Sequence, residues 1–140
     1  MATTTKFLTE FGTVYFHTRA FVLGANTTIP FGTLAMNDAG VIKPAATAVA
    51  GSALMGLCLK GEGYVNATGG NVTQSQEMLF ARGLEVVMMY DTGDPPVVAD
   101  IGKSIAIKDN NTVKHTIAGN DLEVTLTQLL PGNRCRVYLP

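Results

Sequence analysis

LAMNDAGVIK at residues 34–43 and IAIKDNNTVK at residues 105–114 are two copies of one pattern, and this pattern decides the fold. In each copy a short apolar strand runs into a turn of small polar residues, and a second short strand leaves the turn. This order predicts a β-hairpin. The corresponding residues are similar in size or charge: Leu34 and Ile105, Ala35 and Ala106, Met36 and Ile107, Asp38 and Asp109, Ile42 and Val113, and Lys43 and Lys114.

Glycine and aspartate mark the turns of the two copies. Gly32 and Gly102 lie just upstream of the copies, and Gly40 lies in the first turn. Asp38 and Asp109 occupy matching positions, so we expect them to serve turn formation and not catalysis. Two related hairpins about 70 residues apart predict a barrel built from two related halves. Nothing in the repeated pattern activates water, holds a metal or binds phosphate.

The rest of the sequence predicts further short strands, separated by turn signals about every ten residues. The clearest are Leu84 to Tyr90, which is almost wholly apolar, and Leu122 to Leu129, in which apolar and polar residues alternate. The fold class is therefore all-β. We expect a small β-barrel or tulip-like sandwich of about eight to ten short strands, with at most one or two short helices and an extended N-terminal arm. The other expected strands span residues 13–23, 53–60, 78–81 and 134–139.

Two segments are harder to assign. The turn formers in residues 61–71, GEGYVNATGGN, predict an exposed loop. Thr73 and Gln76 have capping-box spacing, which would start a short helix, although a strand at Met78 to Ala81 is the favoured alternative. The expected organisation is an arm over residues 1–12 and a single β domain over residues 13–140.

The composition suits a protein with extensive contacts to other proteins. The 140 residues are 46% hydrophobic and only 15% charged, whereas soluble domains average about 25% charged residues. The formal net charge of −1, with no cluster of Lys and Arg, lacks the electrostatic footprint of a nucleic-acid binder. The apolar runs are too short to cross a bilayer. The N-terminus lacks the apolar region of a secretory signal, so we expect the chain to mature where it is made.

Residues 1–12 combine threonines with large apolar side chains. Threonine favours extended backbone, and an arm of this make-up either folds onto its own domain or docks on a partner. The residues expected to make the contacts of the arm are Thr3, Thr4, Thr5, Phe7, Leu8 and Phe11.

The sharpest candidate for chemistry is Asp91-Thr92-Gly93. Aspartic proteases place Asp-Thr/Ser-Gly after an apolar strand, so that two carboxylates share one proton. The residues that follow are Asp-Pro-Pro, where a small apolar residue is expected. A tight turn explains the triplet equally well.

The histidines and cysteines are isolated. His17 and His115 have no second ligand at metal-binding spacing. Cys58 and Cys135 lie in strand-like runs, and we expect both to be buried free thiols. The sequence therefore predicts no catalytic residue, no metal site and no cofactor.

Several short apolar and glycine motifs lie along the chain: Ile29-Pro30-x-Gly32-Thr33-Leu34, Gly40-Val41-Ile42-Lys43-Pro44-Ala45, Gly56-Leu57-Cys58-Leu59, Ile101-Gly102 through Val113, and Arg134-x-Arg136-Val137-x-Leu139. In these motifs the chain resembles the phage capsid decoration proteins, also called cement or head-stabilising proteins. The resemblance touches about two-thirds of the chain.

The resemblance implies a non-enzymatic virion protein that binds the outside of a phage capsid. Such a protein would form a homotrimer and clamp neighbouring major capsid subunits, with its arm paired to the capsid lattice. It would be made in the host cytoplasm and then reside on the capsid surface, without a cofactor. The alternatives are another phage structural β module of a tail, tube or fibre base, a retroviral-type aspartic protease using Asp91-Thr92-Gly93, and a ligand-binding barrel.

Overall fold

The computed structural model describes residues 14–18, 21–74 and 78–140, so the expected arm, residues 1–12, lies outside the described residues. The described residues form strands, turns and one 3-10 turn, η1 (Val98–Asp100). The predicted all-β fold class is confirmed. The strands are β1 (Val14–Thr18), β2 (Val22–Leu23), β3 (Thr27–Ile29), β4 (Leu34–Asp38), β5 (Val41–Pro44), β6 (Ser52–Cys58), β7 (Tyr64–Asn66), β8 (Val72–Thr73), β9 (Met78–Arg82), β10 (Leu84–Tyr90), β11 (Ser104–Ile107), β12 (Thr112–Lys114), β13 (Glu123–Leu130) and β14 (Arg134–Leu139).

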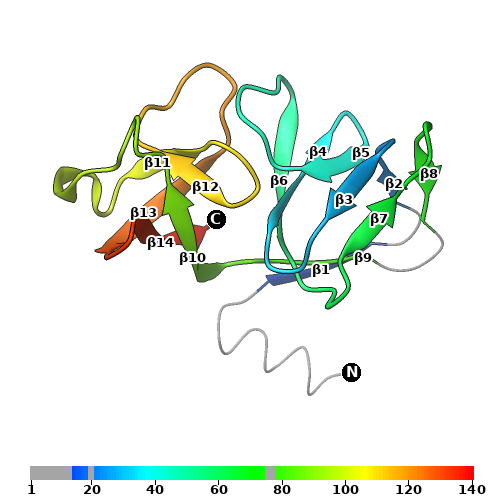
Figure 1. The fold of residues 1–140 in the computed structure, drawn as a ribbon, viewed down its shortest axis with the longest axis horizontal. Helices are drawn as coiled ribbons and strands as arrows, with labels where there is room; N and C mark the ends of the chain where they lie inside the picture. The colour runs from blue at the N-terminus through cyan, green and yellow to red at the C-terminus, as the bar shows by residue number, and fades with distance from the viewer. Residues whose placement is uncertain (1–13, 19–20, 75–77) are drawn as a thin grey trace.

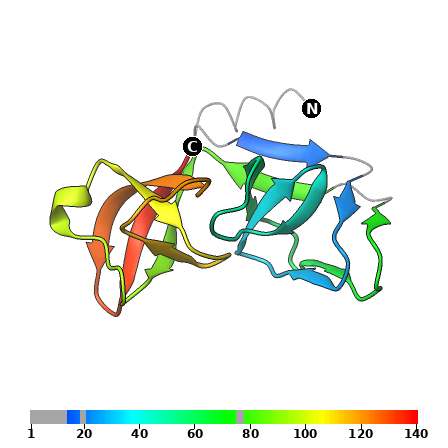
Figure 2. The ribbon, with the colours of Figure 1, turned by 90° about the horizontal axis from the view of Figure 1, so that it is seen from above.

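The strands build a closed barrel and a larger open sheet, which lie side by side (Figure 1). The barrel has the order β10-β12-β11-β13-β14, and it closes where β14 pairs with β10. The larger sheet has the order β1-β9-β6-β4-β5-β2-β8, and β3 and β7 form a separate two-stranded sheet. Figure 2 shows the chain passing from one half to the other where β9 leads into β10. The strand predicted at Met78 to Ala81, in preference to a helix, is confirmed as β9.

Both copies of the repeated sequence form antiparallel hairpins, as predicted, and each copy lies in its own sheet. In the first hairpin the turn residues Ala39 and Gly40 have positive φ angles of 52° and 90°. A two-residue turn of this kind matches the twist of the flanking strands. Asn37 Oδ1 accepts the Gly40 N–H at 2.7 Å. In the second hairpin Asp109 Oδ1 accepts the Asn111 N–H at 3.0 Å, so this carboxylate shapes its turn.

Asp38 has a different role from its counterpart Asp109. It ends β4, and its Oδ2 lies 2.8 Å from Lys43 Nζ across the hairpin. The side chain that holds the first turn is therefore Asn37, one residue earlier than the matching position in the repeat. The two turns differ because the first is a tight two-residue connection, whereas the second hairpin has a longer loop between β11 and β12.

The glycines upstream of the two copies have the same backbone role. Gly32 and Gly102 both have positive φ, 78° and 87°. The Gly32 N–H donates to the Cys58 carbonyl at 2.9 Å, and the Cys58 N–H donates back to the Thr33 carbonyl at 2.8 Å. Gly102 and the residue after it make the same reciprocal pair with Leu126, at 2.7 and 3.0 Å. Each hairpin is thus joined in the same way to its neighbouring strand, β6 or β13.

The strand order itself is duplicated. The antiparallel series β4-β6-β9-β1 corresponds to β11-β13-β14-β10, and the parallel pair of β2 and β5 corresponds to that of β10 and β12. In the barrel, β10 is continuous and fills both places that β1 and β2 occupy in the first half. The strand predicted over residues 13–23 is therefore wrong as a single strand, because β1 and β2 lie near opposite ends of the larger sheet, beside β9 and β5.

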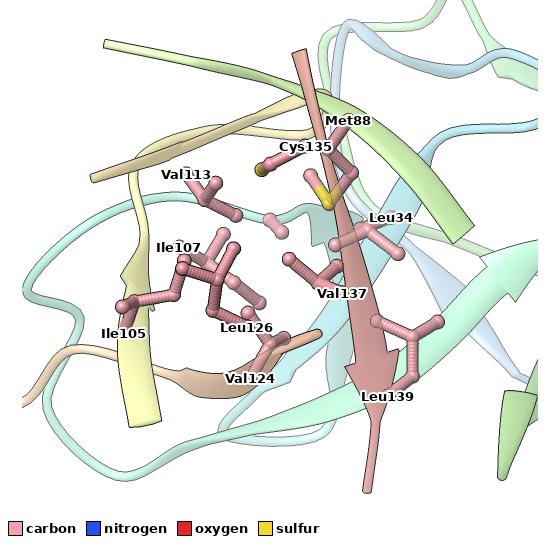
Figure 3. Packing of buried hydrophobic residues seen from close by; sticks show 11 residues of the cluster. Leu34, Met88, Ile105, Ile107, Val113, Val124, Leu126, Cys135, Val137 and Leu139 are labelled. Atoms are coloured by element: carbon pink, nitrogen blue, oxygen red, sulfur yellow. The ribbon is translucent and has the colours of Figure 1, made fainter. Parts of the chain in front are cut away.

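Two clusters of buried hydrophobic residues fill the two halves, and the halves share packing. Leu34 of the first half belongs to the cluster of the barrel (Figure 3), and so does Ala45. The Leu34 N–H also donates to the Asn110 carbonyl at 2.8 Å. The barrel contributes Met88, Ile105, Ile107, Val113, Val124, Leu126, Cys135, Val137 and Leu139. The first half has a second cluster of Leu23, Ile29, Ala35, Ile42, Cys58, Tyr64, Met78 and Phe80.

A buried carboxylate fastens the first half to the barrel. The Asp121 side chain is 0% exposed. Its Oδ1 accepts the Thr47 hydroxyl at 2.6 Å and the Ala48 N–H at 2.7 Å, both from the first half. Its Oδ2 accepts the Ala118 N–H and lies near Lys114 Nζ, both at 3.0 Å. Burial alone would raise the pKa of Asp121, but these four donors outweigh it and hold the pKa well below its usual range.

Residues 61–71 are not simply the exposed loop that their turn formers predict. β7 lies within them and pairs with β3, and both Tyr64 and Asn66 are buried. Tyr64 Oη accepts the Leu79 N–H at 2.7 Å. Asn66 Nδ2 donates to the carbonyls of Leu23 and Gly24 at 3.1 and 2.8 Å. These partners are distant in sequence, so the local composition gives no sign of them.

Candidate functional site

The connection between β10 and β11, residues 91–103, is the candidate site. It contains the Asp91-Thr92-Gly93 triplet, two prolines and η1. The corresponding connection of the first half carries β3, so this part of the barrel is not repeated. Three aspartates within it accept hydrogen bonds that fix its path, and each has a separate set of partners.

Asp91 begins the connection and is engaged within its own turn. Its Oδ1 accepts the Gly93 N–H at 3.0 Å, and its Oδ2 lies 3.3 Å from Lys108 Nζ. The Gly93 hydrogen bond, followed by Lys108, lowers the pKa of Asp91. A protease dyad needs two carboxyl groups that share one proton, which requires a raised pKa for one of them. The contacts of Asp91 have the opposite effect, because they favour the ionised carboxylate.

Asp94 ties the connection to the segment that follows β12. Its Oδ2 accepts the Thr116 N–H at 2.9 Å, and its Oδ1 accepts the Thr116 hydroxyl at 3.1 Å. Its carbonyl accepts the His115 N–H at 2.9 Å. One residue therefore makes three hydrogen bonds to two consecutive residues, which sets the position of the loop on the barrel.

Asp100 anchors η1 from the buried side of the loop. Its Oδ2 accepts the Val97 N–H at 2.8 Å and lies 2.6 Å from His115 Nδ1. The Val97 N–H, more than His115, lowers the pKa of Asp100. His115, isolated in the sequence, is thus paired with a carboxylate fifteen residues away, a contact that the sequence did not predict.

The outer side of the anchored loop is apolar. Val98 is 74% exposed, and Val97 and Ile101 on either side of η1 are also exposed. Ile117, which follows the residues bonded to Asp94, is exposed as well. We call Val97, Val98 and Ile101 the apolar loop. An exposed cluster of large apolar side chains typically marks a contact surface for another molecule.

The arrangement can therefore present apolar side chains on a fixed frame. The loop backbone is held by three carboxylates and by the Gly102 pair with β13. Because the loop is already fixed, it would lose little conformational entropy when a partner covers it. Preorganisation of this kind strengthens binding. The Asp91-Thr92-Gly93 triplet marks this connection in the sequence, but the sequence does not predict that Val97 and Val98 are exposed.

The other residues singled out in the sequence lie elsewhere or beyond the described ranges. Cys58 and Cys135 are free and buried, as predicted. Burial raises the pKa of both thiols, that of Cys135 to about 11. The arm residues Thr3 to Phe11 lie outside the described residues, and so does the side chain of His17.

Within the described ranges, no group of three or more His, Cys, Asp or Glu residues is arranged to hold a metal ion. None of the helical segments in the same ranges is long and apolar enough to cross a membrane. No family model, curated protein or solved structure matches the chain.

Proposed function

We propose that the protein is a non-enzymatic structural protein of a phage virion. It binds the outside of the capsid as a homotrimer and stabilises the shell by clamping neighbouring major capsid subunits. The observation that carries the proposal is the apolar loop, in which exposed valine and isoleucine side chains stand on a backbone fixed by Asp91, Asp94 and Asp100. The capsid as partner comes from the resemblance of the sequence motifs to decoration proteins.

Two further features support a role in assembly. The chain has few charges for its length, which suits a surface that is largely covered by partners. The hydrogen bonds of buried Asp121 and the shared core join the two halves, so force applied to one half is carried to the other. A protein that holds capsid subunits against internal pressure needs this kind of internal connection.

The proposal is tested by cosedimentation with shells assembled from a phage major capsid protein. Val98→Asp places a charge in the centre of the apolar loop. We expect capsid affinity to fall more than about tenfold, since burial of a valine contributes roughly 1.5 kcal/mol or more. Because Val98 is 74% exposed, the variant should fold with unchanged stability.

The matched control is Val65→Asp. Val65 is also a valine with most of its surface exposed, 62%, but it lies on β7 in the first half. It should bind capsids as the wild type does. Light scattering should give a particle of three times the 14.8 kDa chain mass. The proposal fails if the wild type does not bind shells, and the role of the loop fails if the two valine variants bind equally well.

A further inference from the structure

The barrel has a second outward surface, formed by β10 and β14. Along both strands the side chains alternate, and those of Met88, Cys135 and Val137 point into the core. The residues between them point outward. In the antiparallel register, Arg136 lies opposite Val87 and Arg134 lies opposite Met89. We call the outward residues the arginine face: Glu85, Val87, Met89, Arg134, Arg136 and Tyr138.

The composition of the arginine face is that of a protein interface. Val87, Met89 and Tyr138 are exposed although they are large and apolar or aromatic. Met, Tyr and Arg are enriched in the cores of interfaces, and lysine is depleted there. The face contains no lysine. The residues of adjacent strands that pair with it are uncharged: Thr112 opposite Met89, Thr125 opposite Tyr138 and Gln128 opposite Arg136.

Among the described residues, the two guanidinium groups have no carboxylate partner. No ion pair involves Arg134 or Arg136 in the part of the chain that the structure describes. Arg134 Nε donates to the Pro131 carbonyl at 3.1 Å, which leaves the other N–H groups of that guanidinium free for an incoming acceptor. Glu85, the acidic residue of the face, is paired in register with Tyr138 and not with an arginine.

The spacing of the arginines specifies what could bind them. Residues two apart on one strand point the same way and are separated by about 7 Å. An extended segment with carboxylates at alternate positions repeats at the same distance. Each carboxylate can accept two N–H groups from one guanidinium. The aliphatic carbons of these acidic side chains, which all point toward the face, would contact Val87 and Met89 directly opposite the arginines.

We propose that the arginine face binds an extended acidic segment of a partner protein, with carboxylates at alternate residues that all point toward the face. The inference deepens the proposed function by giving the chemistry of a second capsid contact, separate from the apolar loop. A protein segment is favoured over nucleic acid because the guanidiniums alternate with apolar side chains across the two strands, and because the whole chain has a net charge of −1.

The test uses the full chain and a defined peptide. An eight-residue peptide with glutamate at alternate positions and valine or threonine between them is titrated into isotope-labelled protein and followed by NMR. We expect shifts at the Met89 methyl group and at the side-chain N–H groups of Arg134 and Arg136. The double variant R134Q/R136Q should bind at least about tenfold more weakly. Affinity should also fall as salt rises from low to physiological concentration.

Three controls separate the outcomes. A peptide with glutamine in place of glutamate should bind much more weakly, and Lys43→Gln, which removes a half-exposed cation of the first half, should leave binding unchanged. The proposal is overturned by equal binding of the two peptides, by shifts located elsewhere, or by no binding. It is also overturned if oligothymidylate of similar length binds the face more tightly than the acidic peptide.

The capsid proposal can fail independently of this one. Peptide binding to the arginine face without any binding of the wild type to shells would support the acidic-segment site and refute the capsid function. Capsid binding that Val98→Asp removes and R134Q/R136Q does not change, together with an inert peptide, would refute the acidic-segment site alone.

Discussion

Replacement of Asp121 by asparagine should destabilise the whole protein, because this side chain connects the two halves. Asparagine keeps one acceptor oxygen for Thr47 and Ala48 but turns an amide donor toward the Ala118 N–H and the Lys114 ammonium. The loss of a charge-assisted hydrogen bond and one buried unsatisfied N–H together cost about 3 kcal/mol. For a chain of this size we expect the midpoint of thermal unfolding to fall by about 10 °C.

The control is Asp38→Asn, which removes a partly exposed ion pair with Lys43. Exposed pairs contribute at most about 1 kcal/mol, so this variant should unfold near the wild-type midpoint. Circular dichroism during heating and in urea measures both variants. A midpoint for Asp121→Asn that lies at or above that of Asp38→Asn would refute the view that the buried carboxylate fastens the halves.

The acid dependence of the stability of the wild type and of Asp121→Asn gives an independent check. The pKa of Asp121 is lowered in the folded state, so its contribution is complete above the unfolded-state pKa of about 3.9. It is lost as the pH falls below that value toward the folded-state pKa. The difference in unfolding free energy between wild type and Asp121→Asn should be constant near neutral pH and shrink below about pH 4. A difference that grows in acid would contradict the assignment.

The remaining predictions concern the turn, the thiols and the arm. Ala39→Asn should stabilise the protein by about 0.5 kcal/mol in urea titration, because Ala39 has φ of 52° and Asn-Gly suits this turn; a loss of stability would argue against the turn geometry. Cys58 and Cys135 should react with a thiol reagent at pH 8 only after unfolding, since both are buried and the pKa of Cys135 is raised to about 11; rapid labelling of the native protein would contradict this. Deletion of residues 2–12 should abolish capsid binding and leave a folded trimer, and unchanged affinity of the truncated trimer would refute the role of the arm.

The sequence predicts the repeated elements well because the information for them is local. The alternation of apolar and polar residues, the turn formers and the glycines before each copy lie within a few residues of the hairpins that they specify. β10 is predicted equally well, because its apolar run is long and is ended by the Asp91 turn. The free buried thiols follow from the same strand patterns.

The parts that the sequence does not predict depend on residues far apart. Tyr64 and Asn66 become buried through hydrogen bonds to Leu79, Leu23 and Gly24, which no local pattern reveals. The division of the first strand into β1 and β2 has no clear signal in the residues around it.

The same limit applies to the candidate site. Val98 is apolar, and an apolar residue in a strand-rich chain would ordinarily be assigned to the core. It is exposed because Asp94 and Asp100 bond to Thr116 and His115 and so turn the loop outward. The placement of Arg134 and Arg136 opposite Met89 and Val87, and not opposite a carboxylate, is likewise a property of the register between β10 and β14 and not of either strand alone.

The most direct measurement is an electron cryomicroscopy map of capsid shells mixed with the full chain. The account predicts additional trimeric density at three-fold or quasi-three-fold points, with residues 97–101 in contact with a major capsid subunit. Shells that carry no added density would contradict the proposed function. Bound protein with Val98 exposed to solvent would contradict the role assigned to the apolar loop.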